Sequence, residues 1–132
     1  NLGRALVLQG ELTQAGEHYA RALALLEHSH DANFAGLAKP LTGQGLLALA
    51  AGRPTDALPP LERALAIGVA DPAKLAELHL ALARALWATR ADRPRARALA
   101  EQARSELAAD AGPMQARIGD QLTEWLAAHP LP

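Results

Sequence analysis

The stretch Gly45–Leu65, GLLALAAGRPTDALPPLERAL, decides the fold because the chain contains its pattern more than once. Moving back 42 residues gives Gly3–Leu23, GRALVLQGELTQAGEHYARAL, in which Gly3, Gly10, Ala15 and Ala22 match Gly45, Gly52, Ala57 and Ala64. A looser third copy follows, in which Ala83 stands 38 residues after Gly45. A fixed period in this range is typical of an array of units, each of which buries its apolar face only against its neighbours.

Each copy indicates two helices joined by a short turn. Gly10 and Gly52 suit the left-handed position that closes a first helix, and Pro54 suits the first turn of a second helix. Small residues such as Gly45 and Ala57 let two antiparallel helices approach closely. The chain has 32 alanines and 25 leucines but only four valines and isoleucines together, a composition that favours helices over strands.

The pattern LGRALVLQG…A…Y…AL over Leu2–Leu23 resembles the tetratricopeptide repeat. Its 42-residue spacing resembles the longer variety found in kinesin light chains and in many bacterial signalling proteins. The resemblance implies an all-α solenoid of antiparallel helical hairpins, about seven helices, in a single domain. The expected parts are repeat 1 at 1–30 (truncated at its N-terminus, which indicates a piece of a longer chain), repeat 2 at 31–70, repeat 3 at 71–109 and a capping helix at 113–129.

Within this scheme, helix boundaries follow from local residues. We expect Gly10 to end the first helix and a partner helix to run from Leu12 to about His28. Asp31 is expected to cap the next helix, which runs to Ala51, with Pro40 kinking it or delaying its start.

The later helices have clearer boundaries in the sequence. Pro54 should begin a helix that reaches about Gly68 and bends at Pro59-Pro60. Asp71-Pro72 should start a helix to about Thr89, and Asp92 should cap one that ends near Ala109. In the last helix, Met114, Ile118, Leu122 and Trp125 should share a face, with Trp125 preferred as core of the cap over a binding residue.

Composition and motifs exclude several function classes. A net charge of −1 without a basic block argues against nucleic acid or an anionic membrane as the main partner. No apolar run reaches the roughly 18 residues of a membrane span. The absence of cysteine excludes disulfides and thiolate metal sites and fits a cytoplasmic location. Phosphate loops and the common hydrolase and metalloprotease motifs are also missing, so no catalytic residue and no cofactor is predicted.

Two charged clusters have both a bland and a functional interpretation. His28, His30 and Asp31 suggest a metal site, but loop neighbours without cysteine or a helical HxxxH pair are more often solvated, so no metal is predicted. A basic cluster follows further along the chain, for which a solvated face partly balanced by Glu101 and Glu106 is preferred over a binding patch. It consists of Arg93, Arg95, Arg97 and Arg104.

The resemblance implies a peptide-binding groove lined by the first helix of each repeat. The candidate groove residues are Asn1, Arg4, Lys39, Thr42, Leu46, Leu49, Glu77, Leu80, Arg84 and Trp87. Asn1 stands where related repeats often hold peptide backbone, because its amide both donates and accepts. The last four lie at the spacing of one helix face. For Trp87, packing against the preceding repeat as ordinary core is an equal alternative.

The predicted function is that of a non-catalytic module that binds a protein or peptide of unknown identity. The stretch Leu82–Arg104 and the final EWLAAH resemble the C-terminal end of bacterial serine/threonine kinases that carry such arrays, typical of myxobacteria. The module would then be the docking or regulatory arm of a larger signalling protein, as a monomer or weak homodimer. Alternatives are a self-association or structural module, or the sensor arm of a bacterial transcriptional regulator or defence ATPase.

Overall fold

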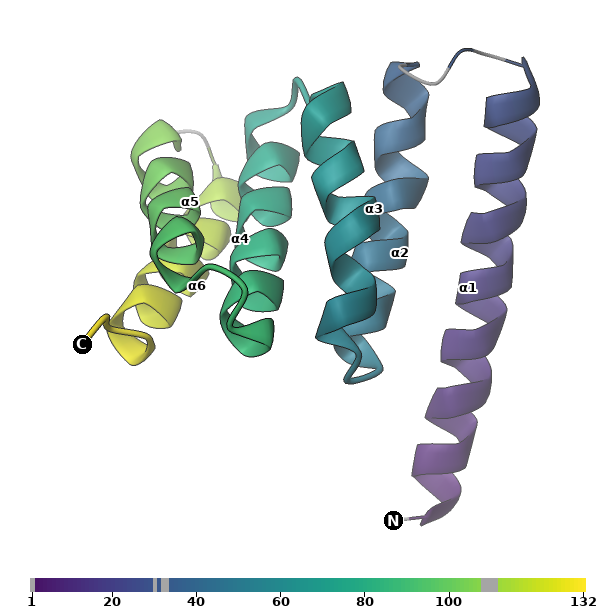
Figure 1. Cartoon of the computed structure of the whole chain (residues 1–132), viewed down its shortest axis with the longest axis horizontal. Helices are drawn as coiled ribbons and strands as arrows, with labels where there is room; N and C mark the ends of the chain where they lie inside the picture. The colour runs from purple at the N-terminus through teal and green to yellow at the C-terminus, as the bar shows by residue number, and fades with distance from the viewer. Residues whose placement is uncertain (1, 30, 32–33, 108–111) are drawn as a thin grey trace. The chain divides into compact units, whose positions relative to one another are not determined.

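Helices make up nearly all of the computed structural model, which describes residues 2–29, 31, 34–107 and 112–132, with side chains from residue 10 onward. This part of the chain has six α-helices, one 3-10 turn and no strand, which confirms the predicted all-α class. Two compact units comprise residues 1–68 and 69–132. The first unit holds α1 (Leu2–Ser29), η1 (Ala35–Leu37), α2 (Ala38–Ala50) and α3 (Pro54–Ile67), and the second holds α4 (Pro72–Thr89), α5 (Arg93–Glu106) and α6 (Pro113–Ala128) (Figure 1).

The hairpin of α2 and α3 forms as the repeat predicts. Gly52 has a φ of 76°, and its N–H donates to the Leu49 carbonyl while the Arg53 N–H donates to that of Ala48. This pair of bonds closes the helix, and Pro54 begins the next one where no backbone donor is needed. A Cβ placed on Gly45 would clash with the Leu61 side chain, so glycine allows the two helices to touch.

The first repeat departs from the prediction, because α1 is one continuous helix of 28 residues and does not end at Gly10. The expected hairpin is therefore wrong here, and the described residues form six helices in place of the expected seven. The physical reason is the residue two positions after each glycine. Gly52 is followed by Pro54, which cannot continue a helix, whereas Gly10 is followed by Glu11 and Leu12, both good helix formers. A lone glycine inside a helix costs only about 1 kcal/mol.

Prolines in α2 and α3 behave differently from one another. Pro40 delays the helix, since α2 starts only at Ala38 and so keeps Pro40 in its first turn. The residue before α2 is Leu37 and not Asp31, so the predicted cap is wrong. Helix α3 continues through Pro59 and Pro60 to Ile67.

In the second unit, the starts of both predicted helices are confirmed. Helix α4 begins at Pro72 after Asp71, although the Asp71 side chain makes no cap bond among the described residues. Asp92 caps α5 by accepting a hydrogen bond of 3.0 Å from the Arg95 N–H. The turn between them lacks glycine, and Arg90 takes the left-handed conformation in its place, with a φ of 59°. Helix α5 ends at Glu106, three residues before the predicted Ala109, which lies outside the described residues.

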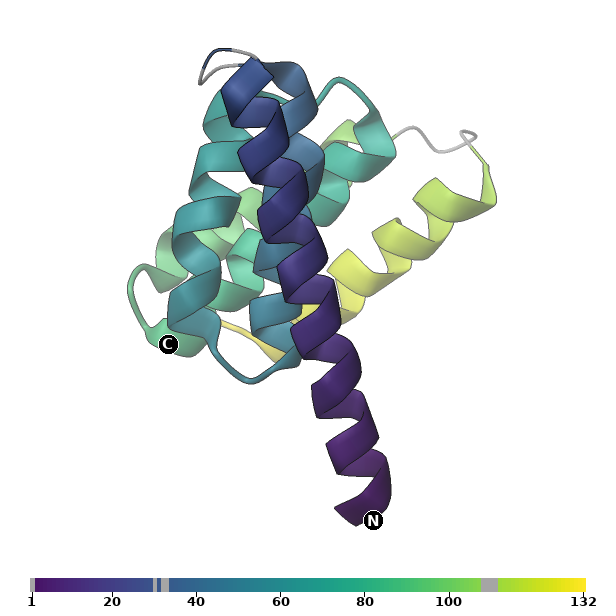
Figure 2. The same cartoon turned by 90° about the vertical axis from the view of Figure 1, so that its right-hand side faces the viewer.

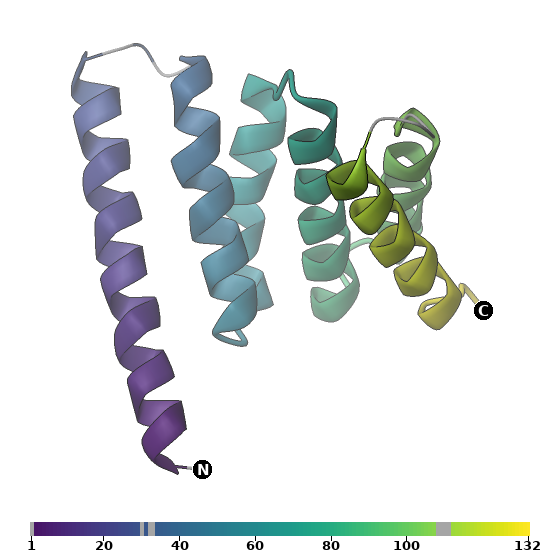
Figure 3. The same cartoon turned by 180° about the vertical axis from the view of Figure 1, so that it is seen from behind.

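The last helix covers the second unit as predicted. Helix α6 lies at a slant to α4 and α5 (Figures 2 and 3) and buries Ile118, Leu122 and Trp125. Trp125 is 7% exposed, so its assignment as core is confirmed. Met114, in contrast, is 62% exposed, so the predicted apolar face begins one turn later.

Candidate functional site

The predicted groove residues of the first unit lie on α2, with two exceptions. Asn1 lies outside the described residues, and Arg4 lies in α1 in the part without described side chains. Lys39 is exposed and Leu46 and Leu49 are half-buried on α2. Thr42 is half-buried and donates its hydroxyl to the Ala38 carbonyl at 2.7 Å. This bond occupies the Thr42 donor, so the side chain can offer a partner only its acceptor lone pairs.

In the second unit, the predicted residues of α4 differ in their exposure. Glu77 and Arg84 are exposed, whereas Leu80 is only 1% exposed and is part of the hydrophobic core. Trp87 is half-buried. The opposite charges of Glu77 and Arg84, seven residues apart on α4, are therefore the most accessible predicted groove residues of this helix. Peptide contact by the ten predicted residues stays a prediction.

Trp87 belongs to an aromatic cluster that the sequence did not predict. Its ring meets the Trp125 ring edge-on with centroids 5.7 Å apart, and that of His129 at 5.2 Å. The Trp125 and His129 rings stack at 4.4 Å. The Arg93 guanidinium lies 4.6 Å from the centre of the Trp87 ring, a cation–π contact. Trp87 thus packs against the capping helix, whereas the sequence offered only the preceding repeat as its core partner.

The basic cluster of α5 also has a structural role. Arg97 donates to the carbonyls of Leu126 and His129 at 2.9 and 2.8 Å, and forms an ion pair of 3.2 Å with Glu101. Both carbonyls lie at the C-terminus of α6. A helix C-terminus leaves backbone acceptors unpaired and carries partial negative charge, so it attracts a cationic donor. Arg104 remains exposed. The preferred interpretation of a solvated face is therefore wrong for Arg97, which binds the end of the capping helix, and for half-buried Arg93, which contacts Trp87.

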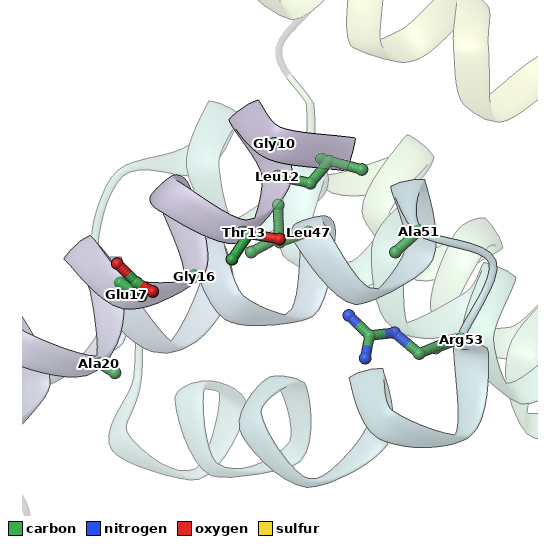
Figure 4. A pocket seen from close by; sticks show the side chains of 9 residues that line it. All are labelled: Gly10, Leu12, Thr13, Gly16, Glu17, Ala20, Leu47, Ala51 and Arg53. Atoms are coloured by element: carbon green, nitrogen blue, oxygen red, sulfur yellow. The ribbon is translucent and has the colours of Figure 1, made fainter. Parts of the chain in front are cut away.

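The first unit contains a hollow that the sequence did not predict (Figure 4). It has a volume of about 840 Å³ and lies between one face of α1 and the end of α2. The side chains that line it are mostly small or apolar. They are Gly10, Leu12, Thr13, Gly16, Glu17, Ala20, Leu47, Ala51 and Arg53. We call this hollow the α1–α2 groove. This groove could be predicted only by knowing that α1 continues past Gly10, which local sequence rules did not predict.

Other classes of site find little support in the described residues. No group of three or more histidine, cysteine, aspartate or glutamate side chains there could hold a metal ion, and His30 of the predicted cluster lies outside them. No helix in the same part of the chain is long and apolar enough to cross a membrane.

Comparison with known proteins gave one match. The model of a family described as Tetratricopeptide repeat matches residues 1–68, which is slightly more than half of the chain. No curated protein matched the sequence, and no solved structure matched it either.

Proposed function

Because the chain belongs to the tetratricopeptide repeat family, we propose that it binds a protein or peptide as the docking or regulatory arm of a larger signalling protein. Repeats of this family are generally protein-interaction modules. Such arrays present side chains from successive helices as an extended surface for a partner. The observation that carries the proposal is this repeat match together with exposed, chemically varied side chains on α2 and α4.

Each unit offers a surface of its own chemistry. On α2, Lys39 is exposed, and Leu46 and Leu49 are half-buried about two and three turns further along the helix, a combination that suits a segment with an acidic and an apolar side chain. On α4, Arg84 can bind a carboxylate through its planar fork of donors, and Glu77 can bind a basic residue. A segment of mixed charge with one or two apolar anchors is therefore the proposed type of ligand.

The test is to select binding peptides from a random displayed library against the 132-residue chain and to measure their affinities for variants. Arg84→Ala and Lys39→Ala should each weaken the selected peptides by roughly tenfold or more, as expected for loss of a charged hydrogen bond. Arg104→Ala is the control, because Arg104 is exposed on α5 and outside the proposed surfaces. Equal affinities for all of these variants would overturn the assignment of both surfaces.

We propose further that the parent protein is a bacterial serine/threonine kinase of the cytoplasm. The support is the resemblance of Leu82–Arg104 and the final helix to the C-terminal ends of such kinases. A transcriptional regulator or a defence ATPase is the alternative parent. Reading the gene upstream of the Asn1 codon tests this, since a kinase domain, a DNA-binding domain and an ATPase domain carry different motifs.

A further inference from the structure

The α1–α2 groove continues into a second hollow that reaches α3. This hollow has a volume of about 330 Å³ and shares Gly16, Leu47 and Arg53 with the groove, so the two form one surface. Its other lining residues come from α2 and from the first two turns of α3. They are Gln44, Ala48, Asp56 and Pro60. The joined surface, which we call the extended groove, therefore crosses the three α-helices of the first unit.

The contact between α1 and α2 determines what the extended groove can hold. A Cβ on Gly16 would lie 3.2 Å from Leu47 Cδ2, so the two helices touch at the centre of the surface. A further helix, about 10 Å wide with its side chains, cannot enter between them there. The α1–α2 groove alone, at about 840 Å³, is near the upper end of the roughly 300–1,000 Å³ of small-molecule pockets, and the second hollow lengthens it. The shape favours an extended peptide over a helix or a small molecule.

Arg53 is the charged side chain at the junction of the two hollows. It is exposed, and Figure 4 shows its guanidinium group pointing into the groove. Its Nε lies 4.0 Å from the Asp56 carboxylate, which is too far for a hydrogen bond. Within the described part of the chain, this guanidinium makes no other ion pair and no hydrogen bond. Its planar fork of donors is therefore available to bind a carboxylate.

The neighbours of Arg53 determine what else the peptide carries. Half-buried Leu47 and Pro60 offer apolar surface on either side of it. Half-buried Gln44 has a side-chain amide without a hydrogen bond to any described residue, and an amide can both donate to and accept from a peptide backbone. Glu17 lines the opposite side of the groove and repels a second acidic group (Figure 4). These charges place an acidic residue of the peptide at Arg53, with an apolar residue beside it.

We propose that the extended groove binds an extended peptide segment in which an acidic residue, bound by Arg53, is next to an apolar residue that packs on Leu47 and Pro60. This inference rests on the proposed function, that the chain binds a protein or peptide. It adds a surface that is separate from the two already proposed, whose exposed cations are Lys39 on α2 and Arg84 on α4.

The first experiment selects peptides that need Arg53. A random displayed library is selected on the 132-residue chain and counter-selected on Arg53→Gln, which removes the charge and keeps a polar side chain. The Arg53 side chain is 65% exposed, so this variant should keep its helical circular dichroism. The recovered peptides should share an acidic residue next to an apolar one, and their Kd should rise about tenfold or more in Arg53→Gln. The amide NMR signals of Gly16 and Gln44 should shift when such a peptide is added.

The second experiment uses the opposite roles of Arg53 and Asp56. The Asp56 carboxylate lies beside the guanidinium that the peptide needs, and so competes with the acidic residue of the peptide. Asp56→Asn removes this competitor and should lower the Kd of the same peptides about two- to fivefold, the range expected for one exposed charge pair. If the two residues only supported the fold, both substitutions would weaken binding. Arg104→Ala, exposed on α5, is the control and should leave the Kd unchanged.

The outcomes separate this site from the proposed function. Peptides that weaken with Lys39→Ala or Arg84→Ala but bind Arg53→Gln as tightly as the unsubstituted chain would overturn the extended groove and leave the proposed function in place. An Asp56→Asn chain that binds the Arg53-dependent peptides less tightly than the unsubstituted chain, or equally tightly, would also overturn it. A chain that selects no peptide at all would overturn both.

Discussion

Gly45 leaves no room for a side chain, whereas Gly10 lies in open space. A Cβ on Gly45 would clash with Leu61, and one on Gly10 would meet no described atom within 4 Å. Neither glycine has a positive φ, so both are ordinary helical residues in their backbone. The two positions therefore differ only in what surrounds them, and the same substitution should have opposite effects at each.

We expect Gly45→Ala to destabilise the first unit by about 1–3 kcal/mol through overpacking, and Gly45→Leu to destabilise it more. Gly10→Ala is the matched control and should stabilise the protein by about 0.5–1 kcal/mol, since alanine loses less backbone entropy in a helix. Chemical denaturation monitored by circular dichroism measures both. A loss of stability in Gly10→Ala would contradict the continuous α1.

His79 is a histidine inside the core of the second unit. It is 4% exposed, and its Nδ1 has no hydrogen-bond partner among the described residues. Burial lowers the pKa of His79 below its usual value of 6.5, and attraction to the Glu106 carboxylate opposes this only in part. The neutral ring is therefore the form that the folded protein accommodates.

This lowered pKa makes stability depend on pH. Between pH 6.5 and the folded pKa of His79, the unfolded chain binds a proton that the folded chain does not. The stability that comes from burying neutral His79 is therefore fully present above pH 6.5 and is lost as the pH falls toward the folded pKa. The slope from this one group is at most about 1.4 kcal/mol per pH unit. His79→Leu should flatten the curve of unfolding free energy between pH 7 and 5 relative to the unsubstituted chain. Equal slopes for the two proteins would contradict the effect.

At the scale of the elements, the sequence predicts helix boundaries well where two signals coincide. Glycine with proline at 52–54 and aspartate with proline at 71–72 gave correct boundaries. Gly10 alone did not, because one weak breaker is outweighed by good helix formers on both sides. Leu80 and Trp87 show a second limit, since helical spacing places residues on a face but does not tell which neighbour covers that face.

The capping helix is held by Trp87 of α4 and Arg97 of α5, and Arg93 packs on the Trp87 ring. Truncation of a buried tryptophan costs about 3–5 kcal/mol, and half-buried Trp87 should approach the lower end of that range in Trp87→Ala. Met114→Ala is the control, because Met114 is exposed and should change stability by less than about 0.5 kcal/mol. Urea denaturation measures both. A Trp87→Ala protein of unchanged stability that has lost peptide binding would return Trp87 to the predicted groove.

At the scale of the molecule, each compact unit must bury its own apolar side chains against a terminal helix. In the second unit, α6 supplies Ile118, Leu122 and Trp125 to this end. The sequence predicted this helix and its role because it departs from the repeat pattern. The α1–α2 groove could not be predicted in the same way, since it exists only if the first repeat fails to form its hairpin.

Removal of residues 113–132 should expose the apolar side chains that α6 covers, including Trp87. We expect the shortened chain to aggregate, or to unfold at a temperature several degrees lower, because a loss of about 1 kcal/mol shifts the midpoint of a domain this size by roughly 2–8 °C. Calorimetry and light scattering test this. A shortened chain that keeps the same midpoint and remains dispersed would show that α6 is not a cap.

The aromatic cluster has a spectroscopic consequence. The chain contains two tryptophans, Trp87 and Trp125, and both rings lie in the second unit. Its single tyrosine, Tyr19, lies in the first unit against Gly43. Indole fluorescence excited at the red edge therefore reports on residues 69–132 alone, whereas far-ultraviolet circular dichroism reports on the helices of both units. One unlabelled sample can thus show whether the two halves of the chain melt together or in sequence.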